Sequence, residues 1–343
     1  MPKVLYGVSP IGLGHATRTI AVLERLSAAG VDIRLFSSGD PARFLEDCGY
    51  PTEDVISGSA PAVANGEMKR AALWYIRSWA ALKRTTPRTE NVFDDYKPDL
   101  VVCDEEFSGL GVAARRGCKS VFIADELELG FARGRFARAV EKRVERWYKK
   151  LQEAVDLLVI PEFGVDAGNR RYVGPVVRPV TQSSADTRAR YNLPSGGKMI
   201  LLSMSGSRIG AFLLEVVVSA MKESSIPEAF LVVSGNRARR VTGKGIYDLG
   251  MVLDNQNLVA AADLALSTAG KSTQDEAASE GTPFIGIPIR NHAEQERNAA
   301  SLGYSSKDAG RIRDLIGDKI GKRSTPLKFQ GAKTACDLLV SSL

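Results

Sequence analysis

The sequence predicts an α/β protein with two doubly wound domains, each a parallel β-sheet covered by helices on both faces. Two observations support this fold class. Short apolar or β-branched runs alternate with longer helical patterns along the chain. The 343 residues are also enough for two domains of about 150 residues each. With 44% apolar and 25% charged residues, the composition is that of a folded globular protein.

Five apolar runs in the first half predict strands, and helical windows lie between them. Only a parallel sheet covered on both faces buries such continuous apolar strands, and the intervening helices supply that cover. We therefore expect an N-terminal domain over residues 1–175. Its predicted strands are residues 4–9, 31–38, 100–104, 121–125 and 157–161.

The second half repeats this pattern after residues 174–184, which contain two prolines, lack periodicity and are interpreted as a linker. We expect a C-terminal domain over residues 185–325. Ser324 and Thr325 supply an N-cap and Pro326 an N1 residue, so a last helix is predicted over 326–343, packing back on the N-terminal domain. The predicted strands are 199–203, 230–234, 264–267 and 284–287, and the predicted helices are 209–223, 272–280 and 293–302.

Two such domains facing each other direct the carboxyl ends of both sheets into one cleft, where ligands of open α/β folds bind. We expect the site in that interdomain cleft.

Several function classes are excluded by composition. No run approaches the roughly 18 to 20 apolar residues of a membrane span, and the N-terminal run is too short for a secretion signal. The four cysteines are widely spaced, which favours reduced thiols and a cytoplasmic protein. With only His15 and His292, a histidine-rich metal site is excluded, so we expect no metal.

Positive charge is concentrated in residues 131–150, which contain eight lysines or arginines against two glutamates. This excess of six equals the formal net charge of the whole chain, +6. Apolar residues recur at helical spacing there, so the segment predicts a basic amphipathic helix, and residues 67–90 predict a second one. Two interpretations stay open: the apolar stripe packs on a sheet, or the helix docks on an anionic membrane surface. No nucleic-acid motif is present.

The first strand is followed by GLGHATR, residues 12–18. Gly12 and Gly14 allow a tight turn in which backbone N–H groups at the helix start approach a phosphate or sugar, and His15 lies at the cleft mouth. The alternative is that the glycines only permit the turn and His15 caps the helix. Thr17 replaces the third glycine of the dinucleotide fingerprint, which disfavours a nicotinamide-dependent oxidoreductase.

The second half offers two further binding segments. Ser205, Gly206, Ser207 and Arg208 lie between a strand and a helix, where N–H groups and a guanidinium suit a diphosphate; the alternative is an ordinary N-cap with a solvated arginine. Residues 267–299 run from a strand through a glycine turn and a helix to a second strand and a polar loop. The groups of that loop that suit sugar hydroxyls are Asn291, His292, Glu294, Gln295 and Asn298.

These motifs resemble those of GT-B glycosyltransferases, in particular the MurG-like group (glycosyltransferase families 28 and 1), which transfer a sugar from a nucleotide donor. The similarity covers both halves: GLGHxxR in the first, and GKSTxxEAxxxGTPxIxIP followed by EQxxNA in the second. The second signature is the specific one. The resemblance implies the GT-B fold, with two Rossmann-like domains, and a nucleotide-sugar donor.

The resemblance also implies roles for individual residues. Glu276 would accept hydrogen bonds from the donor ribose, Gly270, Lys271, Ser272 and Thr273 would face the phosphates, and Ser205 to Arg208 would hold the diphosphate. Glu294 and Gln295 would contact the transferred hexose, and Val252 would meet the base through its backbone. Glu294 stands where the relatives have an amide, so the hexose is left open.

Glycosyl transfer needs a base for the acceptor hydroxyl and positive groups for the leaving diphosphate. We expect His15 to be the base, oriented by Asp104, although Asp125 or Glu126 are open alternatives; helix N-termini with Arg208 or Lys271 would stabilise the diphosphate. The resulting hypothesis is that the protein transfers a hexose or N-acetylhexosamine from a UDP-sugar to a hydroxyl, with inversion and without a metal ion. A membrane lipid is one candidate acceptor, and in that case the protein is expected to be peripheral on the inner face of the membrane. A nucleotide-sugar 2-epimerase and a non-catalytic, membrane-associated binding protein are the alternatives.

Overall fold

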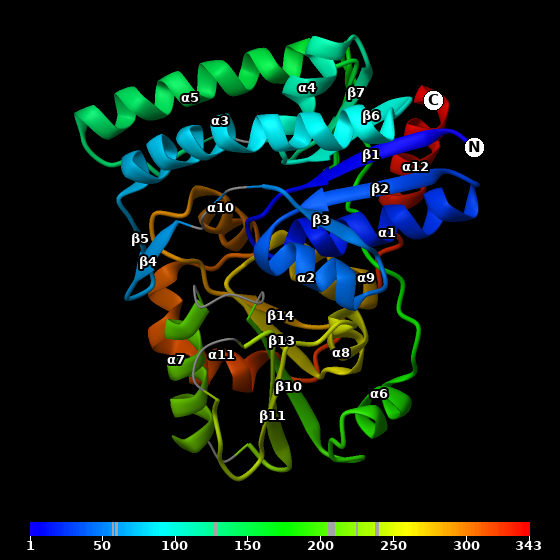
Figure 1. The fold of residues 1–343 in the computed structure, drawn as a ribbon. Helices are drawn as coiled ribbons and strands as arrows, with labels where there is room; N and C mark the ends of the chain where they lie inside the picture. The colour runs from blue at the N-terminus through cyan, green and yellow to red at the C-terminus, as the bar shows by residue number, and fades with distance from the viewer. Residues whose placement is uncertain (57, 59–60, 127–128, 205–209, 224–225, 237–239) are drawn as a thin grey trace. The chain divides into compact units, whose positions relative to one another are not determined.

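The computed structural model describes all residues except 57, 59–60, 127–128, 205–209, 224–225 and 237–239. The chain forms two compact units (Figure 1). Unit 1 contains Met1–Ala62, Arg70–Val177 and Phe329–Leu343, and unit 2 contains Val63–Lys69 and Arg178–Lys328. Both units have mainly parallel sheets in a Rossmann-like arrangement, as the predicted fold class requires.

Unit 1 is built on a seven-stranded sheet in the order β3-β2-β1-β6-β7-β8-β9, in which neighbouring strands are parallel. The order reverses between β1 and β6, so these central strands flank the topological switch point of the sheet. The strands are β1 (Lys3–Val8), β2 (Asp32–Ser37), β3 (Thr52–Asp54), β6 (Leu100–Asp104), β7 (Lys119–Ile123), β8 (Leu157–Ile160) and β9 (Arg170–Tyr172).

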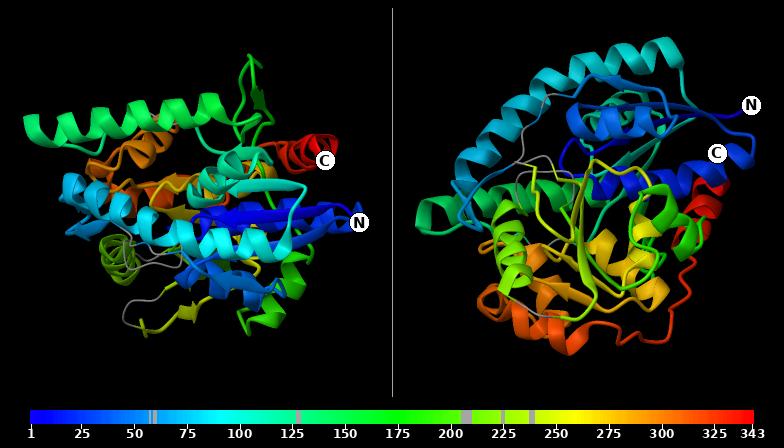
Figure 2. Two further views of the ribbon diagram at one scale, coloured as in Figure 1. Left: turned by 45° about the horizontal axis from the view of Figure 1, so that its top comes forward. Right: turned by 90° about the horizontal axis from the view of Figure 1, so that it is seen from below.

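Helices cover both faces of this sheet (Figures 1 and 2). On one face α3 packs against α4 and α5; on the other α1 packs against α2 and α12. Val4–Tyr6 of β1 and Leu100–Cys103 of β6 are completely buried, which explains their apolar sequences. The helices are α1 (Gly14–Ala28), α2 (Gly39–Asp47), α3 (Ala71–Tyr96), α4 (Ser108–Arg116), α5 (Arg135–Ala154) and α12 (Gly331–Ser342).

Unit 2 contains a five-stranded parallel sheet in the order β12-β11-β10-β13-β14. Alternate residues of β10 face different cores: Ile200 and Leu202 pack in the cluster that includes α7 and α11, whereas Met199 and Leu201 pack with α8 and α9. The strands are β10 (Lys198–Ser203), β11 (Ala229–Ser234), β12 (Ile246–Gly250), β13 (Leu264–Ser267) and β14 (Phe284–Gly286). The helices are α6 (Ser184–Arg190), α7 (Ala211–Glu223), α8 (Asn255–Ala261), α9 (Lys271–Glu280), α10 (Ala293–Ser301), the 3₁₀ helix η2 (Ser306–Arg311) and α11 (Ile312–Lys319).

The chain departs from the sequence prediction at its last helix. The Ser-Thr-Pro signal does not start a helix: residues 322–330 lie outside any helix or strand, and α12 begins only at Gly331. Backbone bonds hold this strap to unit 2: Ser324 donates to Gly281 O at 2.9 Å and Leu327 to Ala278 O at 3.0 Å. A glycine is required at 331, where an added Cβ would lie 2.3 Å from the carbonyl oxygen of Pro175.

Residues 67–69 were predicted to be helical, but they form β5 (Glu67–Lys69), which pairs with β4 (Ala62–Ala64). The reason is a distant partner. Met68 N donates to Arg290 O at 2.9 Å, and Arg290 N donates to Gly66 O at 2.8 Å. Residues 63–69 consequently belong to unit 2, so the expected continuous domain 1–175 is interrupted there.

Candidate functional site

The candidate catalytic residues of unit 1 lie where two neighbouring parallel strands end. His15 is the second residue of α1, which follows β1, and Asp104 is the last residue of β6. Gly12, with φ at 70°, makes the left-handed turn between β1 and α1, and the N–H of Ser9 donates to Asp104 O at 2.9 Å. The fold therefore brings both side chains to the switch point of the sheet, where open α/β proteins bind ligands.

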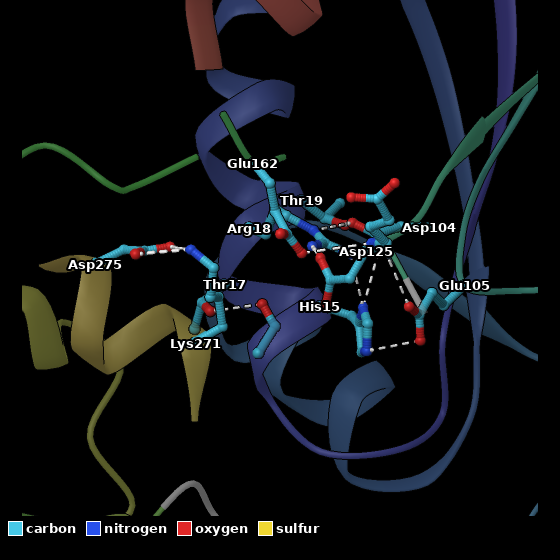
Figure 3. Close-up of polar contacts among 12 residues, drawn as sticks. His15, Thr17, Arg18, Thr19, Asp104, Glu105, Asp125, Glu162, Lys271 and Asp275 are labelled. Atoms are coloured by element: carbon cyan, nitrogen blue, oxygen red, sulfur yellow. Dashed lines mark hydrogen bonds and ion pairs between the residues drawn. The ribbon is translucent and has the colours of Figure 1, made fainter. Parts of the chain in front are cut away.

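His15 and Asp104 are in direct contact. His15 Nδ1 lies 2.8 Å from Asp104 Oδ1, and the Asp104 side chain is completely buried (Figure 3). Nδ1 is also 3.0 Å from Nη2 of Arg18. Both nitrogens lie closer to Asp104 Oδ1 than to each other, so each of them donates to that oxygen. We therefore assign Nδ1–H as a donor to Asp104, which leaves Nε2 as the nitrogen that can take a proton.

Arg18 holds the Asp104 carboxylate from the other side. Its Nε donates to Oδ2 at 2.9 Å and its Nη2 donates to Oδ1 at 2.5 Å, while its Nη1 donates to Asp125 Oδ1 at 2.6 Å. Burial alone would raise the pKa of Asp104, but the charge and hydrogen bonds of Arg18 and His15 hold it below its usual range. Asp104 is consequently a charged acceptor for the imidazole.

A second carboxylate contacts the opposite ring nitrogen. Glu105 Oε2 lies 3.4 Å from His15 Nε2, and Figure 3 shows contacts from both nitrogens of the ring. Burial lowers the pKa of His15, but the nearby carboxylates of Glu105 and Asp104 outweigh it and raise the pKa to about 9. Burial raises the pKa of Glu105 itself.

Of the three carboxylates predicted as possible partners of His15, only one contacts its imidazole. Asp104 contacts the imidazole, whereas Asp125 contacts Arg18, and Glu126 accepts a hydrogen bond from Tyr172 at 2.9 Å. Two residues of the cluster, Arg18 and Glu105, were not predicted. Arg18 follows His15 by three residues on one helix face, and this spacing is a signal that the sequence does contain.

The glycine turn predicted to face the donor phosphates lies at the switch point of the unit 2 sheet, between β13 and α9. Gly270 is the extended N-cap of α9, and Lys271, Ser272 and Thr273 form its first turn. Lys271 Nζ is 2.7 and 2.9 Å from the two carboxylate oxygens of Asp275 (Figure 3). Ser205, Gly206, Ser207 and Arg208, the predicted diphosphate segment, lie outside the described residues.

Glu276 and Val252 are both buried. The Glu276 carboxylate lies 3.7 Å from an Arg178 nitrogen, and the side chain of Glu276 is 6% exposed. Burial raises the pKa of Glu276, and the charge of Arg178 opposes that rise. Val252 packs in the apolar cluster with Leu258. Their roles toward a ribose and a base stay predictions.

In the polar loop, two predicted sugar-binding residues shape the loop itself. Asn291 has φ at 63°, and its side-chain amide donates to Glu67 Oε1 at 2.8 Å. Gln295 Oε1 accepts the N–H of Ile289 at 3.1 Å. Glu294 lies in the first turn of α10 and is partly exposed. Contact of these residues with a hexose also stays a prediction.

The described part of the chain offers no candidate for a metal cluster or for a membrane span. No group of three or more histidine, cysteine, aspartate and glutamate side chains there is arranged to hold a metal ion. None of the described helices is long and apolar enough to cross a membrane.

Comparison with known families finds two matches. Residues 2–129 match the glycosyl transferase family 1 profile, and residues 215–312 match the glycosyltransferase family 28 C-terminal domain. An uncharacterized glycosyltransferase of Methanosarcina acetivorans is 24% identical over 317 residues, covering 87% of this chain and 82% of the relative. The UDP-N-acetylglucosamine--N-acetylmuramyl-(pentapeptide) pyrophosphoryl-undecaprenol N-acetylglucosamine transferase of a Nocardioides species is 26% identical, covering 88% of this chain and 84% of the relative.

Solved structures share the fold. MurG of Acinetobacter baumannii superposes with a TM-score of 0.60 at 17% identity, covering 99% of this chain and 100% of that chain. The S. aureus MnaA-UDP co-structure gives a TM-score of 0.63 at 13% identity, covering 100% of this chain and 98% of that chain.

Proposed function

Because the chain is a MurG-like GT-B glycosyltransferase, we propose that it transfers a hexose or N-acetylhexosamine from a UDP-sugar to a hydroxyl acceptor, with His15 as the general base. The observation that carries this proposal is the contact of His15 Nδ1 with the buried carboxylate of Asp104 at 2.8 Å. The name of the Nocardioides relative and the UDP in the MnaA structure support a uridine nucleotide.

The proposed step uses one proton and one displacement. Nε2 of neutral His15 takes the proton of the acceptor hydroxyl while the acceptor oxygen bonds to the anomeric carbon. The bond from that carbon to the diphosphate breaks, and the nucleotide leaves with the electron pair, so the configuration inverts. Asp104 stabilises the imidazolium that forms, and a base in this position typically contributes about 10²- to 10⁴-fold to the rate.

On the donor side, we propose that the leaving diphosphate is stabilised by the N-terminus of α9, by Lys271 and by Arg208, without a metal ion. The N–H groups of the first turn of α9 carry partial positive charge. Lys271 already pairs with Asp275, so a bound diphosphate would compete with that carboxylate. Glu276 is the proposed acceptor for the ribose hydroxyls.

We further propose that the acceptor hydroxyl belongs to a membrane lipid, and the surface of α5 supports this. Trp147 and Leu151 pack against the core of unit 1, but Phe136 is 73% exposed on the same helix, among basic side chains. On α3, which contacts α5, Ile76 and Trp79 are also exposed. An apolar surface bordered by lysines and arginines suits anionic lipid headgroups.

The lipid proposal is tested by sedimentation with phosphatidylglycerol-containing vesicles. We expect binding that Phe136→Ser weakens and that 0.5 M salt, about a 4 Å Debye length, releases. Phe163→Ser is the matched control, because Phe163 is 77% exposed outside α5. Equal binding by Phe136→Ser and Phe163→Ser, or binding independent of salt, would argue against docking through α5.

The transferase proposal is tested first by thermal shift with UDP, GDP and TDP and their sugars, because a ligand that binds the native state raises the melting temperature. The best donor is then incubated with candidate hydroxyl acceptors and the products are analysed. Formation of a new glycoside supports the transferase. Free UDP with an altered sugar, in the absence of acceptor, would identify the epimerase alternative instead.

A further inference from the structure

We infer that Glu105 is a positioning residue that acts on the catalytic base: it holds a proton on His15 Nε2 in the resting site and so limits how much of the base is ready to react. This inference rests on the proposed role of His15. Asp104 acts on Nδ1, and Glu105 acts on Nε2, the nitrogen that would receive the acceptor proton.

The geometry places the two carboxylates on opposite edges of one imidazole. The distances are 2.8 Å from Nδ1 to Asp104 and 3.4 Å from Nε2 to Glu105. The side chains of His15 and Glu105 are 18% and 19% exposed, so water screens their interaction only partly. A protonated imidazole satisfies both carboxylates, whereas a neutral one can donate to only one of them.

The backbone of Glu105 is held in a conformation that glutamate rarely adopts. Its φ is 45°, in the left-handed region that favours glycine. Its N–H donates to Ile123 O at 3.0 Å, which fixes this conformation at the end of β6. Strained residues of this kind cluster at functional sites, and here the strain aims a carboxylate at His15.

The charges that face His15 come from three elements. Arg18 is on its own helix, Asp104 and Glu105 end β6, and Asp125 follows β7. Three carboxylates therefore surround one guanidinium, and Arg18 donates to Asp104 and Asp125. A proton on His15 reduces the remaining negative charge, which agrees with the raised pKa of this histidine.

This arrangement determines how the base is prepared. While His15 carries the extra proton, Nε2 cannot accept another one from an acceptor hydroxyl. The proton must first pass from Nε2 to the Glu105 carboxylate or to water, which leaves neutral imidazole with Nδ1–H still donated to Asp104. Removing the charge of Glu105 should therefore increase the neutral fraction at pH 7.

The direct test is an NMR titration of ¹³C-histidine-labelled full-length protein. The chain has only two histidines, so His292, whose pKa burial lowers to about 4, serves as the internal reference. We expect the pKa of His15 to fall by about one unit or more in Glu105→Gln, the effect typical of a charge at this distance. The matched control is Glu126→Gln, which neutralises an exposed carboxylate that accepts a hydrogen bond from Tyr172; the pKa of His15 should not change in this variant.

A second variant guards against misfolding. Glu105→Gly suits the left-handed backbone, which offsets the loss of the ion pair with His15, so we expect a folded protein with a melting temperature close to that of the unmodified protein and the same fall in the His15 pKa. An unchanged His15 pKa in both folded variants would overturn the inference.

Turnover separates this inference from the proposed function. If His15 is the base, the rising limb of the pH–rate profile should shift to lower pH in Glu105→Gln by as much as the NMR titration does. If the His15 pKa measured by NMR falls in Glu105→Gln but the rising limb of the pH–rate profile does not move, Glu105 remains the partner of His15 and His15 is rejected as the base.

Discussion

At the scale of residues, the Arg18 guanidinium is the centre of the buried cluster. It is 8% exposed and bridges Asp104 and Asp125, which would otherwise repel each other. A buried carboxylate left without its partner is far more costly than a surface ion pair is favourable. Arg18 therefore stabilises the folded state of the site as well as its charge pattern.

We predict that Arg18→Met lowers the free energy of unfolding by about 3–5 kcal/mol, the usual cost of breaking a buried ion pair. Urea denaturation followed by tryptophan fluorescence measures this, because Trp74, Trp79 and Trp147 all lie in unit 1. The control is Arg25→Met, at an exposed position of the same helix, which should change stability by at most about 0.5 kcal/mol. Equal losses in the two variants would refute the prediction.

The raised pKa of His15 gives a second prediction at this scale. A base must be neutral, and with a pKa of about 9 the neutral fraction falls about tenfold for each pH unit below that value. The rate with acceptor should therefore rise with pH from 6 to 8 and level off near 9. Steady-state kinetics over that range measure it, and a rate that is flat or falling between pH 6 and 8 would contradict it.

Folding stability depends on the same proton. The pKa of His15 is raised above 6.5 in the folded state, so protonation of His15 adds to the free energy of unfolding. This contribution is fully present below pH 6.5 and is lost as the pH rises through about 9.

The sequence singled out His15, the only histidine of the expected N-terminal domain, in the turn after the first strand, and Asp104, at the end of another apolar strand; strand ends of a parallel sheet meet at one edge. It did not predict Glu105, the next residue after Asp104. Its position depends on a left-handed backbone, and nothing local requires that conformation in a glutamate. The side chains of Asn291 and Gln295 could not be assigned either, because their partners, Glu67 Oε1 and Ile289 N, depend on how the loop folds.

At the scale of elements, a buried glutamate joins α5 to α3 and to the loop before α5. Glu141 Oε1 accepts hydrogen bonds from the Tyr75 hydroxyl at 2.9 Å, from Phe131 N at 2.8 Å and from Ala132 N at 3.0 Å. The loop that contains Phe131 and Ala132 leads from β7 to α5. Glu141 consequently fixes the path of the chain into the basic helix.

We predict that Glu141→Ala destabilises unit 1 by about 3 kcal/mol, because two buried N–H groups lose their acceptor. Tyr75→Phe removes only one of the three bonds and should cost about 1 kcal/mol. Lys142→Ala, the exposed neighbour on α5, is the control and should be close to neutral. The measurement is again urea denaturation; a loss in Glu141→Ala no larger than in Lys142→Ala would exclude the predicted role.

Local patterns predicted most strands and helices near their observed positions, since both faces of each central strand are buried and the periodicity is strong. They failed where a distant segment decides the structure. The edge of β5 is occupied by Arg290, more than 200 residues away in the chain. The strap at 322–330 does not continue as a helix, because α9 and its C-terminal turn supply the hydrogen-bond partners of Ser324 and Leu327.

At the scale of the whole molecule, the two units repeat one design. Each has a parallel sheet whose strand order reverses at its centre, and each carries a candidate site where the central strands end. His15 and Asp104 occupy that position in unit 1, and the turn at Gly270 occupies it in unit 2. We therefore assign the base to unit 1 and the nucleotide to unit 2, so the two functions are separable by mutation.

The most direct test of this division compares His15→Ala with Glu276→Gln, chosen because Glu276 is buried against Arg178 and a glutamine keeps its shape. Donor affinity is measured by isothermal titration calorimetry and turnover with the same UDP-sugar. We predict that His15→Ala lowers turnover by about 10²-fold or more at unchanged donor affinity, whereas Glu276→Gln weakens donor binding by about 1–3 kcal/mol. Full turnover in His15→Ala, or a parallel loss of donor affinity, would contradict the assignment of His15 as the base.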